Sequence, residues 1–221
     1  MGAVSADSRT GDFGTAYGIT SDTTILVPKH SFSLGKEMTA YTGLVTLVQL
    51  SASTIGDRNP VSHDVGISVI KNVLTATKRL KEDPEDADAR GVILYGASIS
   101  TSRRLGLGKE ENYAYEICEL EFIPEVLYGS TYRKSLTTLF PRFLETMSKY
   151  READIRRYLS DAFGCEDDVA DSCGKLVELF EELGVDMHFD GEASSEKVRD
   201  IDISTTLSVD EISDLLRNCL R

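Results

Sequence analysis

The stretch Leu34–Ser51, LGKEMTAYTGLVTLVQLS, decides the fold class. Its larger apolar residues recur three and four positions apart, as on one face of an α-helix, and they are Met38, Tyr41, Leu44, Val45 and Val48. Ser33 precedes this run and is a residue type that caps helix N-termini, so it is expected to start the helix. The same helical spacing continues through most of the later sequence. The chain is therefore predicted to be mainly α-helical.

Further helices are predicted from this spacing and from residues that start or end helices. Pro60 is expected near the start of a helix that runs to about Leu80 through Val65, Val69, Ile70, Val73 and Leu74. Gly184 supplies a helix stop, and Ser208-Val-Asp-Glu resembles a capping box at the start of a last helix to Cys219. Helices are also expected over Ala87–Ser98, Glu110–Leu127, Thr131–Lys149, Ala153–Ala162 and Val169–Leu183, with a polar loop over Gly191–Asp202.

The first thirty residues differ from the remainder. Thr15–Thr20 and Thr23–Val27 are short and rich in β-branched residues, and Pro28 ends the second run. They predict two short strands before the helical part. The expected organisation is a small β element over residues 1–30 and an all-α domain over residues 31–221.

Composition excludes several classes of partner. The chain has 221 residues and a formal net charge of −13, which argues against nucleic acid and anionic membrane surfaces. No apolar run is long enough to span a bilayer, and the first residues lack the pattern of a secretory signal. The four cysteines are widely spaced, which does not suit a zinc site and suits reduced thiols. A cytoplasmic protein is expected.

Three groups of residues invite a chemical interpretation, and for each a structural role is favoured. Gly106–Lys109 (GLGK) lacks the span and the preceding strand of a phosphate-binding loop, so a plain connection between helices is expected. His30, His63 and His188 are far apart and are expected at the surface or at helix ends. The acidic clusters are expected at helix starts or on hydrophilic helix faces, and they are Glu82–Asp88, Glu116–Glu121 and Glu166–Asp171.

Stretches along nearly the whole chain carry a family resemblance. Thr23–Leu34 (TTILVPKHSFSL) has the pattern of a strand and proline-containing turn that lead into a helical domain. Thr39–Leu50 (TAYTGLVTLVQL) aligns with a family helix that carries Asp-Ala-Phe-x-His, a motif that this chain does not have. Tyr128–Tyr132 (YGSTY) aligns with the family motif His-Gly-x-x-His. In this order the stretches resemble the butanol-dehydrogenase branch of the iron-dependent alcohol dehydrogenases. The resemblance implies the C-terminal helical bundle of that family, which is dehydroquinate synthase-like.

The resemblance also implies where a metal would be held. In the family an Asp and three His bind iron or zinc, and the metal polarises the alcohol oxygen. The corresponding positions here read Thr39, Gly43, Tyr132 and, at or near the second His, Glu116. Glycine has no ligand atom, and Thr and Tyr hydroxyls are weak ligands for a divalent ion unless they are deprotonated. The sequence therefore predicts neither a metal site nor a catalytic residue.

A second departure concerns the cofactor. The family begins with a nucleotide-binding domain for NAD(P), whose Gly-Gly-Gly-Ser turn and Thr-Gly-Ser-Glu motif do not occur here. Residues 1–30 are interpreted as the remnant of that domain. The prediction is a truncated, inactive relative without metal or NAD(P) that acts as a binding or assembly module.

Two other functions stay open, together with a prediction about assembly. One is a component of an NAD(P)-dependent alcohol or aldehyde oxidoreductase completed by a separate nucleotide-binding subunit. The other is a helical scaffold for a small molecule in the old interdomain cleft. Because bare strand edges are normally paired or covered, the chain is expected to self-associate through residues 13–28 and the old interdomain face.

Overall fold

The structure is a computed structural model that describes residues 2–5, 23–101 and 105–221. The chain divides into two compact units, an N-terminal unit (Met1–Lys109) and a C-terminal unit (Glu110–Arg221). Both units are built mainly from helices, so the predicted fold class is confirmed. The boundary expected after residue 30 separates a supposed remnant of a nucleotide-binding domain from the helical domain, and it stays a prediction.

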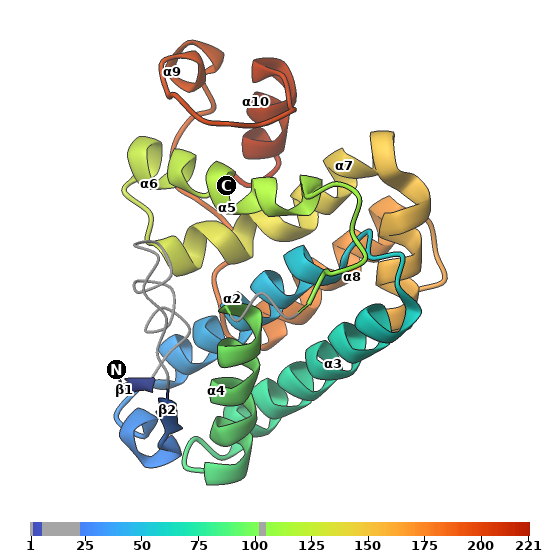
Figure 1. Cartoon of the computed structure of the whole chain (residues 1–221). Helices are drawn as coiled ribbons and strands as arrows, with labels where there is room; N and C mark the ends of the chain where they lie inside the picture. Colours follow the sequence, from blue (N-terminus) through green and yellow to red (C-terminus); the bar gives the residue numbers. More distant parts are fainter. Residues whose placement is uncertain (1, 6–22, 102–104) are drawn as a thin grey trace. The chain divides into compact units, whose positions relative to one another are not determined.

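Three helices form the body of the N-terminal unit (Figure 1). They are α2 (Lys36–Thr54), α3 (Pro60–Glu82) and α4 (Ala87–Thr101). Strands β1 (Gly2–Ser5) and β2 (Thr23–Leu26) pair in parallel, and η1 (Pro28–Ser31) follows them. The predicted strand at Thr23–Val27 is confirmed, and the one at Thr15–Thr20 lies outside the described residues.

Helix α2 packs against α3 and α4, and its residues are buried all round the helix and not on one face. Every residue from Thr39 to Thr54 except Gln49 is buried. Its polar side chains tolerate burial because their hydroxyls donate to backbone carbonyls one turn earlier, at 2.9 Å for Thr46 and 2.7 Å for Ser51. The apolar residues recognised in the sequence are therefore only part of the surface that α2 buries.

Helices α2 and α3 approach each other through two reciprocal contacts between a glycine and a threonine. A Cβ atom at Gly43 of α2 would lie 2.2 Å from Thr77 Oγ1 of α3. A Cβ atom at Gly66 of α3 would lie 2.2 Å from Thr54 Oγ1 of α2. Each glycine therefore accommodates the side chain of the facing helix, and close packing of the two helices depends on both.

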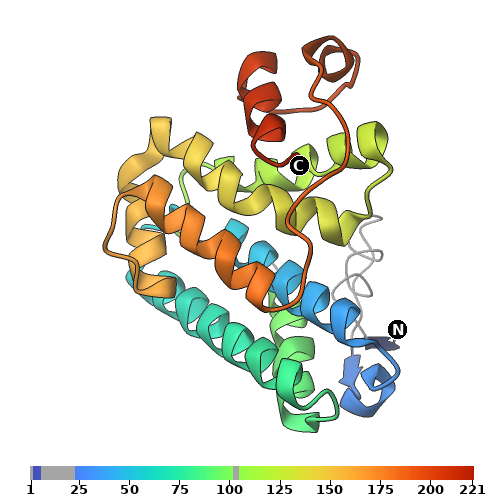
Figure 2. The same ribbon diagram turned by 180° about the vertical axis from the view of Figure 1, so that it is seen from behind.

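Seven helical elements follow in the C-terminal unit, and α7 is the longest of them. They are η2 (Tyr113–Glu116), α5 (Ile117–Leu120), α6 (Phe122–Tyr128), α7 (Tyr132–Phe163), α8 (Val169–Glu182), α9 (Ser195–Arg199) and α10 (Val209–Arg217). Figure 2 shows α8 lying along α7. Between them the core includes the fully buried rings of Phe140, Tyr158 and Phe180.

Several helix boundaries differ from those predicted. Helix α2 begins at Lys36 with Gly35 as its N-cap, so Ser33 is not the cap. The helix predicted over Glu110–Leu127 is instead η2, α5 and α6, and the loop predicted over Gly191–Asp202 contains α9. The helices predicted on either side of Arg151 join into α7 across a kink at that residue (φ −136°, ψ 39°).

Local cap signals were more reliable. Ser208 and Glu211 form the predicted capping box at the start of α10. Gly184 follows the end of α8 with φ +95°, a conformation that glycine adopts easily. Among the described residues, no helix is both long and apolar enough to cross a membrane.

Candidate functional site

Thr39 lies near the start of α2, where Arg90 of α4 engages its hydroxyl. Arg90 Nη2 donates to Thr39 Oγ1 at 3.3 Å, and Thr39 Oγ1 donates to the Leu34 carbonyl oxygen at 3.4 Å. Burial lowers the pKa of the Arg90 guanidinium, against a smaller effect of Glu85 that raises it. A guanidinium nevertheless stays charged in proteins. The position that the resemblance assigns to an acidic metal ligand therefore faces a buried positive charge.

Gly43 lies one turn further along α2 and is closed off by Thr77. Besides the contact with Oγ1, a Cβ atom at Gly43 would lie 3.0 Å from Thr77 Cγ2. Thr77 cannot turn away at low cost, because it is β-branched and its hydroxyl donates to the Val73 carbonyl at 2.8 Å. An imidazole side chain does not fit at Gly43 in this packing.

Glu116 and Tyr132 belong to the C-terminal unit, and Glu116 holds a distant segment of the chain. Its carboxylate accepts from Thr205 Oγ1 at 2.6 Å, from Thr206 N at 2.7 Å and from Thr206 Oγ1 at 2.9 Å. Tyr132 is the first residue of α7 and is half-buried. Glu116 therefore joins η2 to the segment that leads into α10, which is a structural role.

The donor set does not suit a divalent metal. Among the described parts of the chain, no group of three or more His, Cys, Asp or Glu side chains is arranged to hold one. The hydroxyl of Thr39 is bound by a cation, Gly43 has neither a side-chain ligand atom nor space for one, and the Glu116 carboxylate already accepts from three donor groups. The residues at the positions implied by the resemblance thus do not fit the family's iron or zinc.

Within the described residues the histidines are not part of a metal-binding group, and one of them is placed differently from the prediction. His30 is exposed in η1, and His188 Nδ1 lies 3.7 Å from Glu181 Oε1. His63 is only 3% exposed on α3, so the prediction of a surface or capping position was wrong for it. It lies on the buried face of an amphipathic helix together with Gly66 and Ile67, whereas Val65 is 47% exposed.

Two of the acidic clusters cap helices as predicted. Asp86 Oδ1 accepts from Ala89 N at 3.0 Å at the start of α4, and Asp168 Oδ1 accepts from Asp171 N at 2.9 Å at the start of α8. The remaining cluster, Glu116–Glu121, was expected to form a hydrophilic helix face, which is wrong for Glu121 because it is only 3% exposed.

The Gly106–Lys109 loop is a connection between helices, as predicted, and it packs against α2. Lys109 Nζ donates to the Ala52 carbonyl oxygen in the last turn of α2 at 2.6 Å. Gly106 has φ +73°, and a Cβ atom there would lie 2.7 Å from the Ser53 carbonyl oxygen. The lysine therefore stabilises the negative end of a helix, and it is not placed by a strand and a following helix as in a phosphate-binding loop.

The cysteines are free thiols. Burial raises the pKa of Cys173 and of Cys219 to about 12, so neither forms a thiolate near neutral pH. Cys118 and Cys165 are half-buried. None of these features indicates a nucleophilic cysteine.

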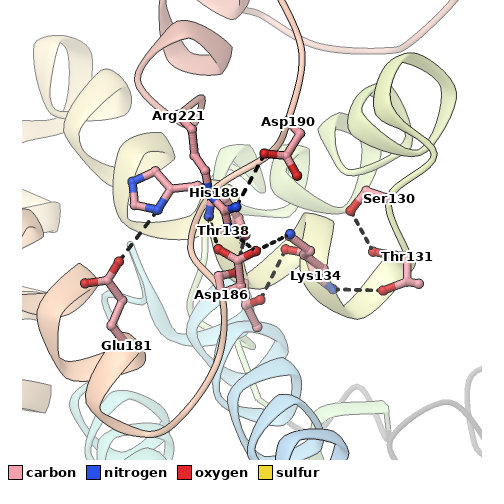
Figure 3. Close-up of polar contacts among 10 residues, drawn as sticks. Ser130, Thr131, Lys134, Thr138, Glu181, Asp186, His188, Asp190 and Arg221 are labelled. Carbon is pink, nitrogen blue, oxygen red and sulfur yellow. Dashed lines mark hydrogen bonds and ion pairs between the residues drawn. The ribbon is translucent and has the colours of Figure 1, made fainter.

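A polar cluster that the sequence did not reveal lies around Asp186 in the C-terminal unit (Figure 3). Asp186 Oδ2 accepts from Lys134 Nζ of α7 at 2.6 Å and from Arg221 Nη2 at 2.7 Å, and Oδ1 accepts from His188 N at 3.1 Å. The backbone of Arg221 also donates to the Phe189 carbonyl oxygen at 3.2 Å. Asp186 thus ties residue 221 to α7 and to the segment after α8.

We expect this cluster to make stability depend on acid pH. Desolvation raises the pKa of Asp186, but the hydrogen bonds from Lys134 and Arg221 outweigh it and the net pKa is lowered. A lowered folded-state pKa contributes stability above the ordinary value of about 3.9, and this contribution is lost as pH falls through the folded-state pKa.

Asp186→Asn should therefore lower the free energy of unfolding by about 1 kcal/mol at pH 7, since the groups are partly exposed. The difference from wild type should shrink below about pH 4. Urea denaturation followed by circular dichroism at several pH values measures both effects. Asp190→Asn is the control, because Asp190 is 79% exposed and lies 3.5 Å from Arg221. Equal effects of the two substitutions would contradict the role given to Asp186.

Comparison with known proteins identifies the fold. No protein-family model matches the sequence, and no curated protein sequence matches it significantly. Among solved structures, NADH-dependent butanol dehydrogenase A from Thermotoga maritima matches with a TM-score of 0.77 over 92% of this chain and 58% of its own, at 16% identity. The aldehyde reductase YqhD from E. coli matches with a TM-score of 0.78 over 91% of this chain and 59% of its own, at 13% identity.

A third structure carries the metal in its name. An iron-containing alcohol dehydrogenase from Thermotoga maritima matches with a TM-score of 0.68 over 91% of this chain and 54% of its own, at 16% identity. This chain spans less than three-fifths of the length of each of the three structures. It therefore has the fold of the C-terminal helical domain of iron-containing alcohol dehydrogenases, as the resemblance implied.

Proposed function

We propose that this chain acts as a binding or assembly module that holds no metal at the position where its structural relatives are expected to bind one. The packing of Gly43 against Thr77 is the observation that carries the proposal. A metal-binding imidazole on α2 would require α2 and α3 to separate, because a Cβ atom at Gly43 already lies 2.2 Å from Thr77 Oγ1. Without that ligand, the remaining side chains are a threonine, a glutamate and a tyrosine.

The charge near Thr39 supports the same proposal. Arg90 lies within hydrogen-bonding distance of the Thr39 hydroxyl, so a divalent cation bound at that oxygen would be repelled by a buried guanidinium. Repulsion between buried charges of the same sign is screened only weakly. Both α2 positions therefore oppose a metal, one by space and the other by charge.

A component of an NAD(P)-dependent alcohol or aldehyde oxidoreductase is the alternative. The names of the matching proteins support it, since they include an NADH-dependent butanol dehydrogenase and an aldehyde reductase. In this case a separate nucleotide-binding subunit supplies the dinucleotide site. The catalytic chemistry then does not depend on a metal held by Thr39 and Gly43.

The proposal extends to assembly and location. Self-association through residues 13–28 follows from the exposed strand edge expected there, although residues 13–22 are outside the described part of the chain. A cytoplasmic location is supported by the four cysteines, all of which are free thiols.

Metal and dinucleotide binding to the purified chain test the proposal. We expect elemental analysis to find well under one equivalent of iron or zinc, and we expect Fe(II), Zn(II), NADH and NADPH to leave the thermal midpoint unchanged. Light scattering on the same sample should report a species larger than one chain. Stoichiometric metal would overturn the leading proposal, and a shift with NADH or NADPH alone would favour the oxidoreductase component. A monomer at tens of micromolar would contradict self-association alone.

A further inference from the structure

We propose that a pocket beside Arg90 in the N-terminal unit binds a monovalent anion no larger than a carboxylate group. The ligand is either a free inorganic ion or the carboxylate of a small organic acid. This inference goes beyond the function proposed above. It shares Arg90 with that argument, but it concerns a bound anion and rests on that buried side chain and the space next to it.

Arg90 is buried to an extent that is unusual for a charged residue. It is 3% exposed in α4, and the ring of Phe32 covers its guanidinium with a distance of 5.6 Å from Cζ to the ring centroid. A charge removed from water in this way is costly unless an opposite charge or several hydrogen bonds compensate it. The surroundings of Arg90 therefore have to supply that compensation.

The described part of the protein supplies only some of the hydrogen bonds, and none of the opposite charge in direct contact, that would compensate the buried guanidinium. Arg90 Nε donates to the Pro84 carbonyl oxygen at 2.7 Å, and Nη2 donates to Thr39 Oγ1 at a longer 3.3 Å. A guanidinium has five N–H donors. Within the described residues, no carboxylate forms an ion pair with Arg90 and no protein acceptor forms a hydrogen bond with Nη1. The exposed Glu85 acts on Arg90 only through its charge.

The space beside Arg90 suits a small ligand. The pocket has a volume of about 250 Å³, which includes space open to solvent, and its inner part has room for about one water molecule. Hydroxyl groups of Ser31, Thr39 and Thr42 line it together with the apolar side chains of Leu34, Leu80 and Ile93. Among the described residues that line the pocket, Arg90 is thus the one that carries a charge.

Two of the three hydroxyl groups that line the pocket already donate to backbone carbonyl oxygens, so the guanidinium is the main donor for a ligand. Ser31 Oγ donates to the Pro28 carbonyl at 2.6 Å, and Thr42 Oγ1 donates to the Met38 carbonyl at 2.8 Å. Thr39 Oγ1 donates only a long bond to the Leu34 carbonyl oxygen and accepts only a long one from Arg90, so its hydroxyl is the one that can reorient toward a ligand. An anion would satisfy the free N–H groups of Arg90 and its charge together, whereas a single water would satisfy only the hydrogen bonds.

An anion exchange at constant ionic strength tests the inference. We expect the thermal midpoint of the wild-type chain to rise by a few degrees, and to saturate, when gluconate is replaced by chloride, formate or butyrate, because gluconate is too large for the inner pocket. A larger shift with butyrate than with formate would assign the site to an organic acid whose tail lies on the apolar lining. A shift with chloride equal to or larger than that with formate would assign it to an inorganic ion.

Substitutions locate the effect. Arg90→Met should abolish the shift, whereas Lys81→Met, which removes the same charge from an exposed position at the end of α3, should retain it. If Arg90→Met does not fold, Arg90→Lys should give a smaller shift because lysine lacks the planar fork. Chloride-35 line broadening by the wild-type chain, reversed by formate, needs no variant. A wild-type midpoint that is the same in all four salts, or an equal rise in Arg90→Met, would show that the pocket holds only water.

Discussion

Gly43→Ala is expected to destabilise the N-terminal unit by roughly 1–3 kcal/mol, even though alanine is the better helix former. Alanine in place of glycine gains about 1 kcal/mol in a free helix. Here the added methyl would meet Thr77 Oγ1 at 2.2 Å and Cγ2 at 3.0 Å, so α2 and α3 must move apart. Gly43→His should be worse and should prevent the unit from folding.

The same contact can be relieved from the other helix. Thr77→Ala removes the two atoms that the new methyl would meet most closely and leaves only Cβ, at 3.1 Å. The Gly43→Ala/Thr77→Ala pair should therefore be more stable than the sum of the single changes predicts, by about 1–2 kcal/mol. Urea denaturation followed by circular dichroism measures the cycle. Gly91→Ala in α4 is the control, since its Cβ would lie at an ordinary 3.6 Å from Pro28 Cγ. If Gly43→Ala stabilises the chain as much as Gly91→Ala does, this result would contradict the close packing of α2 against α3 at Gly43.

Glu116→Ala is expected to destabilise the C-terminal unit by about 2 kcal/mol, because hydrogen bonds to a charged group are stronger than neutral ones. The truncation leaves Thr205 and Thr206 without the carboxylate that accepts their two hydroxyls and one backbone N–H. Glu116→Gln keeps an acceptor oxygen and should cost about half as much.

Local and global readouts separate this role from a general effect of charge. The Thr206 amide should exchange its hydrogen faster in Glu116→Ala, and urea denaturation should report the overall loss. Glu119→Ala is the matched control, because Glu119 is an exposed carboxylate three residues further along. Unchanged exchange at Thr206 would mean that Glu116 does not hold the segment before α10.

Some helix boundaries could have been read more accurately from the sequence. The predicted helix over Glu110–Leu127 contains Pro124, which has no backbone N–H and fits best in a first helical turn. The structure places Pro124 in the first turn of α6, which begins at Phe122. By contrast, the kink in α7 lies at an arginine, Arg151, and not at a proline or glycine from which it could be predicted.

From the sequence, the candidate site was known only as four positions that a family resemblance assigns to metal ligands. That Thr39 and Gly43 lie on one helix follows from their spacing and from the pattern around them. What occupies the space beside them does not, because Arg90 is 51 residues away from Thr39 in the sequence. An arginine at the start of an otherwise apolar run, Arg90-Gly-Val-Ile-Leu94, was the available signal for a buried cation.

The sequence by itself determined the helical class, the capping of α8 and α10 and the residue types at Thr39, Gly43, Glu116 and Tyr132, because these depend on residue types and on neighbours within about one helical turn. Only the tertiary structure decided that Thr77 closes the space at Gly43 and that Arg90 faces Thr39. Both contacts arise when helices distant in sequence pack at close range, and the steric fit and the charge at such a contact are properties of the packed helices together.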